Sequence, residues 1–315
     1  MQKIAVLTSG GDSPGMNAAL YGIIKEAEQK NITVVGCLDG FIGIIKENFI
    51  ELKEKELSKY INIGGTLLGS KRFPDFSKLD IQTKAHSILT QHGIEGLIVI
   101  GGDGSYHGAL ALANLHFPVI AIPGTIDNDI PLTDLTLGFH TAIENAVDAI
   151  DKISTSAYSH GHIFGVEVMG REAGDIAIWS GFATNADAII AKKSDWDLFN
   201  VIQNIENSFE AGKRTQMYIL AEGAISAEEF KRQVEKHSSF KVRTLMLGHI
   251  QRGGTPSVTD RILGIKFGQQ SVRSLINGAQ GKCLSVNNNT IEELDISQVL
   301  KADKGKPFIP YGLDY

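Results

Sequence analysis

The sequence has few of the residues that crosslink a chain or carry it into a membrane. Its 315 residues include only two cysteines, Cys37 and Cys283, too few for a disulfide framework or a zinc site. No apolar run approaches the roughly 18 residues that a membrane span needs. The apolar start is too short for a secretory signal, because Asp12 follows it closely. These absences predict a soluble cytoplasmic protein with an ordinary hydrophobic core.

Positive charge is also in short supply. The chain carries 30 Lys and Arg against 36 Asp and Glu, a formal net charge of −6 at pH 7. Without a basic surplus, the protein is a poor candidate for coating nucleic acid or anionic lipid. The one excess is glycine, at 34 residues or about 11% against a usual ~7%. We expect these glycines to lie in tight loops, within roughly two domains of about 150 residues each.

Short apolar runs with strand composition alternate with longer helical patterns. The expected strands are residues 3–8, 32–38, 97–100, 119–122, 163–168, 188–190, 217–221 and 242–247. The expected helices are residues 16–29, 81–91, 105–115, 141–153, 196–210, 227–236 and 260–276. This alternation, with nearly continuous apolar strands, predicts parallel sheets covered by helices on both faces.

Polar, glycine-rich loops follow several of these strands, at the edge where ligands gather in such a sheet. The loops at residues 10–15 and 101–105 each open a helix, where bare amides and the helix N-terminus attract phosphate. Neither loop matches the Walker or the Rossmann pattern. For either loop alone, the alternative is a tight turn with Asp12 or Asp103 capping the helix. Together the two loops favour a nucleotide phosphate site with Mg²⁺, to which Asp103 would supply a carboxylate.

The segment from Thr125 to Asp129 carries a pair of acids, Asp127 and Asp129. In an extended segment, residues two apart project the same way. One carboxylate could then take a proton from a hydroxyl while the other orients a cation or is held by an arginine. The alternative for this stretch alone is an Asx-turn or a helix cap.

Several cationic side chains are expected at the ends of elements rather than within helices. In a mainly acidic chain, such arginines suggest bidentate capture of phosphate or carboxylate, although each singly is more often a solvated charge. Amides, cations and one carboxylate are the parts that phosphoryl transfer needs. The residues therefore predict a two-domain α/β phosphotransferase with an unnamed phosphorylated acceptor. The cationic residues are Arg72, Arg171, Arg243, Arg252 and His249.

Five motifs resemble those of the bacterial 6-phosphofructokinase family, in order and at matching spacing over essentially the whole chain. They are Leu-Thr-Ser-Gly-Gly-Asp-Ser-Pro-Gly-Met-Asn-Ala, Gly-Gly-Asp-Gly-Ser-Tyr, Pro-Gly-Thr-Ile-Asp-Asn-Asp, Val-Met-Gly-Arg and Gly-His-Ile-Gln-Arg-Gly-Gly. The resemblance implies an α/β fold of two similar three-layer αβα domains with mainly parallel sheets and an active site in the cleft between them. It implies a nucleotide domain of residues 1–138 plus 251–301 and a fructose 6-phosphate domain of residues 139–250 plus 302–315.

The resemblance also implies an activity and the residues that perform it. The γ-phosphoryl group of ATP would pass to the 1-hydroxyl of fructose 6-phosphate, a step of glycolysis, with Asp127 as general base and Mg²⁺ positioned by Asp103. The matched catalytic residues are Asp127, Thr125, Asp129, Arg171, Arg72 and Gly11. The matched nucleotide positions are Gly11, Arg72, Phe73, Gly102, Asp103, Gly104, Ser105 and Gly108. The matched sugar positions are Thr125, Asp127, Asp129, His162, Met169, Gly170, Arg171, Glu222, Arg243, His249 and Arg252.

The family is a cytoplasmic, allosteric homotetramer with sites shared between subunits, and two regions depart from its pattern. His162 stands where an arginine usually reaches the sugar 6-phosphate across a subunit boundary. Because histidine is shorter and only partly charged, we expect weaker fructose 6-phosphate binding and cooperativity. Few cations remain at the effector site, so ADP or phosphoenolpyruvate control is expected to be weak. Its positions here are Tyr21, Lys25, Glu54, Ser154, Asp187, Ala211 and Lys213.

Two glycines bear on the phosphoryl donor. Gly104 and Gly124 match the ATP-using branch, whereas the pyrophosphate-dependent branch carries an aspartate and a lysine there. The alternatives are a pyrophosphate-dependent phosphofructokinase, a kinase that shares the Gly-Gly-Asp-Gly turn, as NAD and diacylglycerol kinases do, and a catalytically silent sugar-phosphate-binding subunit. A silent subunit would not need Asp127, Asp129, Arg171 and Arg72 together.

Overall fold

The computed structural model describes residues 1–305, which divide into two compact units. Unit 1 comprises Met1–Thr141 and Arg252–Gly305, and unit 2 comprises Ala142–Gln251. The sequence-based domain limits fell after residues 138 and 250, whereas the units divide after residues 141 and 251. Of the predicted second-domain segment 302–315, residues 306–315 lie outside the described residues and 302–305 lie in unit 1.

A seven-stranded sheet of order β11-β10-β5-β4-β1-β2-β3 forms the centre of unit 1. Its strands are β1 (Lys3–Ser9), β2 (Thr33–Cys37), β3 (Phe49–Leu52), β4 (Leu97–Gly101), β5 (Val119–Pro123), β10 (Lys282–Asn287) and β11 (Thr290–Asp295). The inner strands run parallel, whereas β3 and β11 pair antiparallel at the two edges. Strands β4 and β5 are buried along their whole length, as a sheet covered on both faces requires.

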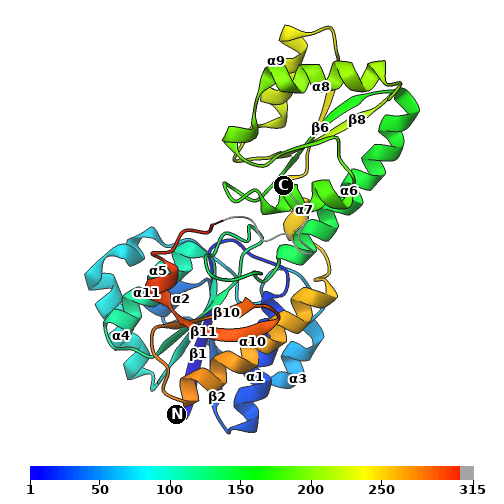
Figure 1. Ribbon diagram of the computed structural model, residues 1–315. Helices are drawn as coiled ribbons and strands as arrows, with labels where there is room; N and C mark the ends of the chain where they lie inside the picture. The colour runs from blue at the N-terminus through cyan, green and yellow to red at the C-terminus, as the bar shows by residue number, and fades with distance from the viewer. Residues whose placement is uncertain (306–315) are drawn as a thin grey trace. The chain divides into compact units, whose positions relative to one another are not determined.

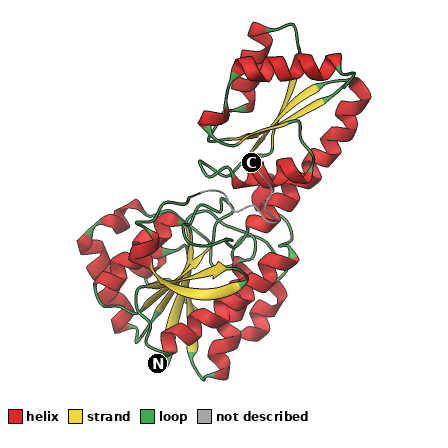
Figure 2. Ribbon diagram, viewed as in Figure 1, coloured by secondary structure: helices red, strands yellow, loops and turns green. Residues whose placement is uncertain are grey.

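Helices cover both faces of this sheet (Figures 1 and 2). Alternate residues of β1 enter different cores: Ile4 and Val6 pack with helices α1 and α10, whereas Ala5 and Leu7 pack toward α4 and α5. The helices are α1 (Met16–Gln29), α2 (Phe41–Ile45), α3 (Glu54–Leu57), α4 (Leu79–Gln91), α5 (Asp103–Asn114), α10 (Val258–Ile276) and α11 (Ile296–Val299). The result is a three-layer αβα unit.

Some glycines serve helix contact rather than a loop. A Cβ atom on Gly22 of α1 would lie 2.3 Å from the carbonyl oxygen of Ile265. One on Gly268 of α10 would lie 2.3 Å from the carbonyl oxygen of Ala19. These helices therefore approach backbone to backbone, and any side chain at the two positions would force them apart. The expectation that the glycine excess lies in tight loops is wrong for these positions.

Unit 2 is built on a four-stranded parallel sheet of order β7-β8-β6-β9. Its strands are β6 (Ile163–Val168), β7 (Ala188–Ile190), β8 (Gln216–Ala221) and β9 (Val242–Met246), and its helices are α7 (Asp175–Ala183), α8 (Leu198–Glu210) and α9 (Ala227–His237). Helices α8 and α9 cover one face, where Phe230 packs over Gly165 of β6. Helix α7 lies over the other face (Figure 1). Helix α6 (Phe139–His160) begins in unit 1 and continues into unit 2.

The predicted α/β class, with mainly parallel sheets covered on both faces, is confirmed. Every predicted strand is present with ends within one residue, but β3, β10 and β11 were not predicted. Strand β11 is mostly exposed and charged, so its apolar pattern is weak. Asn288 and Asn289, which join β10 to β11, have φ values of 49° and 64°. Two adjacent positive φ values are typical of a tight hairpin turn, and this asparagine pair was the available signal.

Two of the longer helices differ from their sequence patterns, and the short helices α2, α3 and α11 were not predicted. Helix α6 was expected to end at residue 153 but continues to His160. The hydroxyl groups of Ser154 and Ser159 donate to the carbonyl oxygens four residues earlier, at 2.8 and 3.1 Å, which accommodates these polar residues in the helix. Helix α7 was missed because its sequence is almost continuously apolar and shows no helical period. Within residues 1–305, no helix combines the length and apolar character needed to cross a membrane.

Candidate active site

Three loops of unit 1 meet at the carboxyl edge of the sheet, after β1, β4 and β5. The Ser105 hydroxyl donates to the Ser9 carbonyl oxygen at 3.0 Å, which joins the first loop to the second. The Gly124 amide donates to the Gly101 carbonyl oxygen at 2.9 Å, which joins the second to the third. Parallel neighbouring strands place their ends together, so this edge is the expected place for a ligand.

The first two loops leave their helix N-termini without a side-chain cap. Gly15, with φ of 101°, precedes α1, and Gly102 precedes α5. In neither case does a side chain bond to the first-turn amides. The alternative that Asp12 or Asp103 caps a helix is therefore wrong. The Met16 and Ser105 amides donate to backbone carbonyl oxygens. The other amides at the start of each helix and the positive potential there favour a bound anion.

Asp103 has the exposure and the chemistry that a nucleotide-borne magnesium ion would require. Its side chain is 57% exposed, and its Oδ2 lies 3.8 Å from the His107 Nε2. Among residues 1–305, no cluster of three or more His, Cys, Asp and Glu side chains could hold a metal. Mg²⁺ commonly takes one or two carboxylates plus phosphate oxygens and water. A single exposed carboxylate beside a helix N-terminus fits an ion that arrives with phosphate.

The loop after β5 buries the carboxyl group of Asp127, which is 1% exposed. The segment is not extended, because Ile126 and Asp127 form a turn and Asn128 has φ of 51°. The Asp127 amide donates to the Thr125 Oγ1 at 3.2 Å, which closes this turn. The premise that Asp127 and Asp129 project the same way from a strand is therefore wrong, and the turn alternative is closer to the observed backbone.

Arg252 connects the first and third loops. Its Nη1 donates to the Asp12 carbonyl oxygen at 3.0 Å, and its Nη2 lies 3.9 Å from the Asp127 Oδ1. A Cβ atom on Gly11 would lie 2.8 Å from the same Nη1, so glycine leaves room for the guanidinium. The resemblance assigned Arg252 to the sugar contacts. In the structure its partners are the buried acid and the first loop, and its charge offsets the cost of burying that carboxylate.

Gly104 and Gly124, the two glycines that bear on the phosphoryl donor, have different surroundings. A Cβ on Gly104 would meet no atom within 4 Å, so this chain alone would accommodate an aspartate there. A Cβ on Gly124 would lie 3.0 Å from Ile100 and 3.2 Å from Met16, so a side chain there would require these neighbours to shift. Gly108 is buried beneath the Phe41 ring, 2.6 Å from the Cβ position, and therefore has a packing role.

Arg72 and Phe73 precede a short 3₁₀ helix, Pro74–Ser77. Arg72 is exposed, and Ser70, two residues earlier, donates its hydroxyl to the Gly10 carbonyl oxygen at 2.6 Å. The chain thus delivers Arg72 close to the first loop. Phe73 is half-buried and its ring centroid lies 6.3 Å from that of Phe76.

In unit 2, a second group of predicted residues lies at the carboxyl edge of the smaller sheet. Met169, Gly170 and Arg171 follow β6, and Glu222 follows β8. The Arg171 amide donates to the Glu222 Oε1 at 3.0 Å, so these two loops are in contact. His249 is exposed in the 3₁₀ turn η4 (Gly248–Arg252), just beyond β9.

His162 and Arg243 lie at the opposite edge of that sheet. His162 immediately precedes β6, and Arg243, the second residue of β9, pairs in register with Phe164. The six residues of β6 span about 20 Å. A single chain therefore does not bring these two residues together with Met169 and Glu222 around one small ligand. Arg243 lies near the amino end of its strand, not the carboxyl end where ligands gather.

The two cations that remain at the predicted effector positions, Lys25 and Lys213, contact other side chains. The Lys25 Nζ lies 5.6 Å from the centre of the Tyr21 ring, and the Tyr21 hydroxyl donates to the Glu54 Oε1 at 3.0 Å. Lys213 forms an ion pair with Asp187. Two further positions offer no charge: the Ser154 hydroxyl bonds to its own helix, and Ala211 follows α8.

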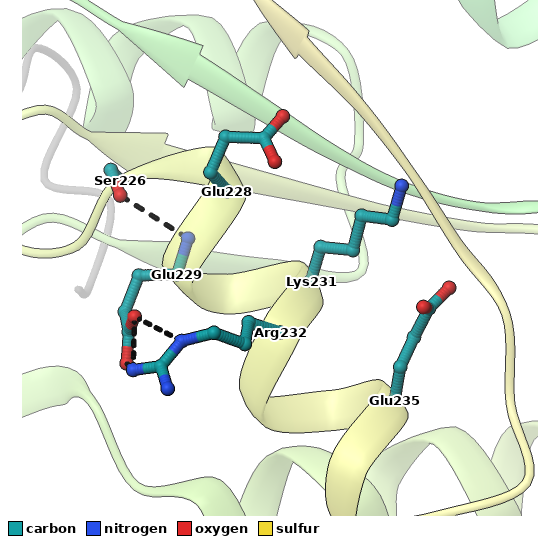
Figure 3. A pocket seen from close by; sticks show the side chains of 6 residues that line it. All are labelled: Ser226, Glu228, Glu229, Lys231, Arg232 and Glu235. Atoms are coloured by element: carbon teal, nitrogen blue, oxygen red, sulfur yellow. Dashed lines mark hydrogen bonds and ion pairs between the residues drawn. The ribbon is translucent and has the colours of Figure 1, made fainter.

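A surface pocket of about 450 Å³ lies along α9 (Figure 3). It is lined by Ser226, Glu228, Glu229, Lys231, Arg232 and Glu235, none of which the sequence pattern had singled out. The Arg232 Nη2 lies 2.6 Å from the Glu229 Oε2, an exposed pair of a kind worth about 0–1 kcal/mol. The pocket is a charged face of α9, a helix that begins five residues after Glu222.

Two residues with evident roles in these loops were not predicted. The Asn128 side chain accepts from the Thr136 amide at 2.9 Å and donates to the Asp134 carbonyl oxygen at 3.1 Å. It thereby closes the loop that carries Asp127, and its tolerance of positive φ was the available signal. Gln251 is fully buried and bonds to the Met169 amide. It belongs to the Gly-His-Ile-Gln-Arg-Gly-Gly motif, but nothing local in the sequence indicates that its side chain is buried.

Loops of this kind, set at the ends of parallel strands around a buried carboxylate, define an α/β protein equipped to hold phosphate groups. Comparison with known proteins narrows that class. The family model described as Phosphofructokinase matches residues 3–275. The chain belongs to the phosphofructokinase family, and the resemblance of its motifs is confirmed.

Curated relatives match over nearly the full chain. The ATP-dependent 6-phosphofructokinase of Enterococcus faecalis is 45% identical over 307 residues, covering 98% of this chain and 96% of that protein. The protein of the same name from Bacillus subtilis is 43% identical, with 96% and 94% covered. The solved phosphofructokinase of Saccharomyces cerevisiae superposes with a TM-score of 0.88 at 28% identity, covering 96% of this chain and 45% of that one.

We expect Asn128→Ala to destabilise unit 1 and lower activity. The variant loses two hydrogen bonds and places alanine at a positive φ, which together should cost about 2–4 kcal/mol. Asn128→Gly loses the same bonds without the conformational penalty, so it should be about 1 kcal/mol more stable than the alanine variant. Urea unfolding measures both differences. Wild-type stability in both variants would contradict the role given to this side chain.

Proposed function

We propose that this chain transfers the γ-phosphoryl group of ATP to the 1-hydroxyl of fructose 6-phosphate, giving fructose 1,6-bisphosphate and ADP, a step of glycolysis. The observation that carries the proposal is the buried Asp127 carboxyl beside the Arg252 guanidinium, at the meeting point of three loops. Full-length similarity to proteins named ATP-dependent 6-phosphofructokinase supports this donor and acceptor.

Asp127 acts as the general base. It accepts the proton of the 1-hydroxyl as that oxygen bonds to the γ-phosphorus, while the bond to the β-phosphate oxygen breaks and ADP leaves. Thr125 closes the turn that holds the carboxyl group, and Asp129 lies on the same loop. Gly11, Arg72 and Arg171 steady the charge of the transferring group, because backbone amides and guanidinium groups suit phosphate oxygens.

The nucleotide side belongs to unit 1. The open N-termini of α1 and α5 attract phosphate, and Gly102, Gly104 and Ser105 stand at the start of α5. Bound Mg²⁺ would be held by Asp103 together with phosphate oxygens, and it would neutralise negative charge on the phosphates. Phe73 completes this side, and Gly108 contributes by letting Phe41 pack against α5.

The acceptor side belongs to unit 2. Met169, Gly170, Glu222 and His249 gather at the carboxyl edge of its sheet and would bind the sugar phosphate. His162 and Arg243, at the far edge, would serve the acceptor site of a second copy. This separation supports a homo-oligomer with shared sites, and the resemblance makes a homotetramer the expected form. A cytoplasmic location is likewise an expectation from the resemblance.

A pyrophosphate-dependent enzyme is the second candidate for the donor. Its lysine would replace Gly124, where a side chain would require Ile100 and Met16 to shift, and this favours ATP. The open space at Gly104 does not separate the two donors, because any crowding there would come from the nucleotide.

The first test is an initial-rate assay with fructose 6-phosphate and Mg²⁺, supplied with ATP or with pyrophosphate. We expect turnover with ATP, and loss of about 10²–10⁴-fold in Asp127→Ser because the general base is removed. Asp134→Ser, which removes another carboxylate from the same loop, should retain activity. Turnover with pyrophosphate alone would reverse the donor assignment, and no turnover with either would point to a silent subunit.

His162→Arg should tighten fructose 6-phosphate binding. The arginine is longer and always charged, so KM for the sugar should fall about three- to tenfold, with cooperativity rising. His160→Arg is the matched control, because the His160 ring stacks on the His162 ring with their centroids 5.6 Å apart. This variant adds a cation close by, at a position that matches no sugar contact of the family. An unchanged KM in His162→Arg counts against the contact.

Control by ADP or phosphoenolpyruvate should be weak. The cations at Lys25 and Lys213 already face the Tyr21 ring and Asp187, and Glu54 adds an acid. An anion would therefore meet little net positive charge. In the same rate assay, ADP should change the fructose 6-phosphate KM less than about twofold. Strong activation by ADP would contradict this expectation.

A further inference from the structure

The turn that follows β6 has an unusual backbone conformation. Gly170 has φ of 123° and Arg171 has φ of 48°. A positive φ is unfavourable for arginine, so this conformation persists only where neighbouring groups hold it. One such group is Glu222, whose Oε1 accepts from the Arg171 amide at 3.0 Å. Because Glu222 follows β8, this support comes from the β8 side of the turn.

The other support comes from the β9 side, where the regular ladder has ended. The Leu247 amide donates to the Glu167 carbonyl oxygen at 3.0 Å. In a continued parallel ladder, the Met169 amide would be the next donor of β6 toward β9. The chain instead coils into η4 after β9. The Gln251 Oε1 takes the place of the missing carbonyl and accepts from the Met169 amide at 3.2 Å.

Gln251 is itself fixed within η4. It is fully buried, and its Nε2 donates to the Gly248 carbonyl oxygen at 3.0 Å. Asn145 of α6 adds two bonds to the turn, donating to the carbonyl oxygens of Ile250 at 3.2 Å and Gln251 at 3.3 Å. Both ends of the Gln251 amide are therefore engaged, and only a side chain with a donor and an acceptor can make both bonds.

We propose that Gln251 is the positioning residue of the acceptor site. It holds the turn with Met169, Gly170 and Arg171 in register with the turn that carries His249. Because Gln251 is fully buried, this role requires no contact with the ligand. The proposal rests on the proposed function and extends it, since it names the group that keeps two loops of the acceptor site at a fixed spacing.

The test compares Gln251→Leu with Gln216→Leu. Gln216 is an equally buried glutamine of unit 2, at the amino end of β8, far from the Met169 turn. Its Nε2 donates to the Ile205 carbonyl oxygen at 3.1 Å and its Oε1 accepts from the Tyr218 hydroxyl at 3.0 Å. Each substitution removes two hydrogen bonds made by a buried glutamine side chain, so the loss of thermal stability should be similar. A difference in kinetics between the two variants would then result from the position of the glutamine.

We expect KM for fructose 6-phosphate to rise about tenfold in Gln251→Leu, because a free Met169 amide lets the turn relax. KM for ATP should be unchanged, and Gln216→Leu should alter neither constant. Hydrogen exchange read by mass spectrometry gives a readout that needs no turnover. Peptides covering residues 169–173 should exchange faster in Gln251→Leu alone.

Gln251→Glu provides the second variant should the leucine variant fail to fold. A protonated carboxyl accepts from Met169 and donates to Gly248, whereas a carboxylate can only accept. Its fructose 6-phosphate KM, relative to wild type at each pH, should therefore fall as the pH is lowered.

The outcomes separate the two proposals. Inactive wild-type protein would refute the proposed function, and the exchange comparison would still decide the role of Gln251. Active protein in which Gln251→Leu and Gln216→Leu share the same KM and the same exchange at residues 169–173 would overturn the positioning role. If only Gln251→Glu folds, a KM ratio to wild type that does not change with pH would overturn it as well.

Discussion

A buried carboxylate, Asp260, joins the parts of unit 1 on which the candidate site depends. Its oxygens accept from the Gly138 amide at 2.7 Å, the Thr141 amide at 2.8 Å and the Thr141 hydroxyl at 2.6 Å. Burial raises the pKa of this carboxyl group despite those bonds. Asp260 lies in the first turn of α10 and its donors lie at the start of α6, so one side chain holds both helix starts and the end of the Asp127 loop.

In each unit, one polar side chain bonds to the loops of the candidate site. In unit 1, Arg252 bonds to the Asp12 carbonyl and approaches Asp127. In unit 2, Gln251 bonds to the Met169 amide and to its own turn. These two residues are neighbours in the chain, where it passes from one unit to the other. The Gly248–Arg252 turn therefore supplies Arg252 to the Asp127 loop of unit 1 and Gln251 to the Met169 turn of unit 2.

Local sequence patterns were enough to predict most of the fold. Strands such as β4 and β6 are short apolar runs bounded by glycine and polar residues, and burial on both faces makes that pattern easy to read. Strand β11 was missed because most of its side chains face solvent, and α7 because its buried sequence has no period. The loops were predicted well for a related reason: glycine and aspartate cluster where strands end.

By itself, the sequence determined the α/β class, the loops that hold the candidate site and the family to which the chain belongs, because apolar runs and loop composition are local properties. Only the tertiary structure decided which polar atoms meet. It turned the Asp127 segment away from an extended strand, placed Arg252 against it and set His162 and Arg243 at the opposite sheet edge from Met169. Those contacts join residues far apart in the chain, and their partners depend on strand order and register, which no local pattern encodes.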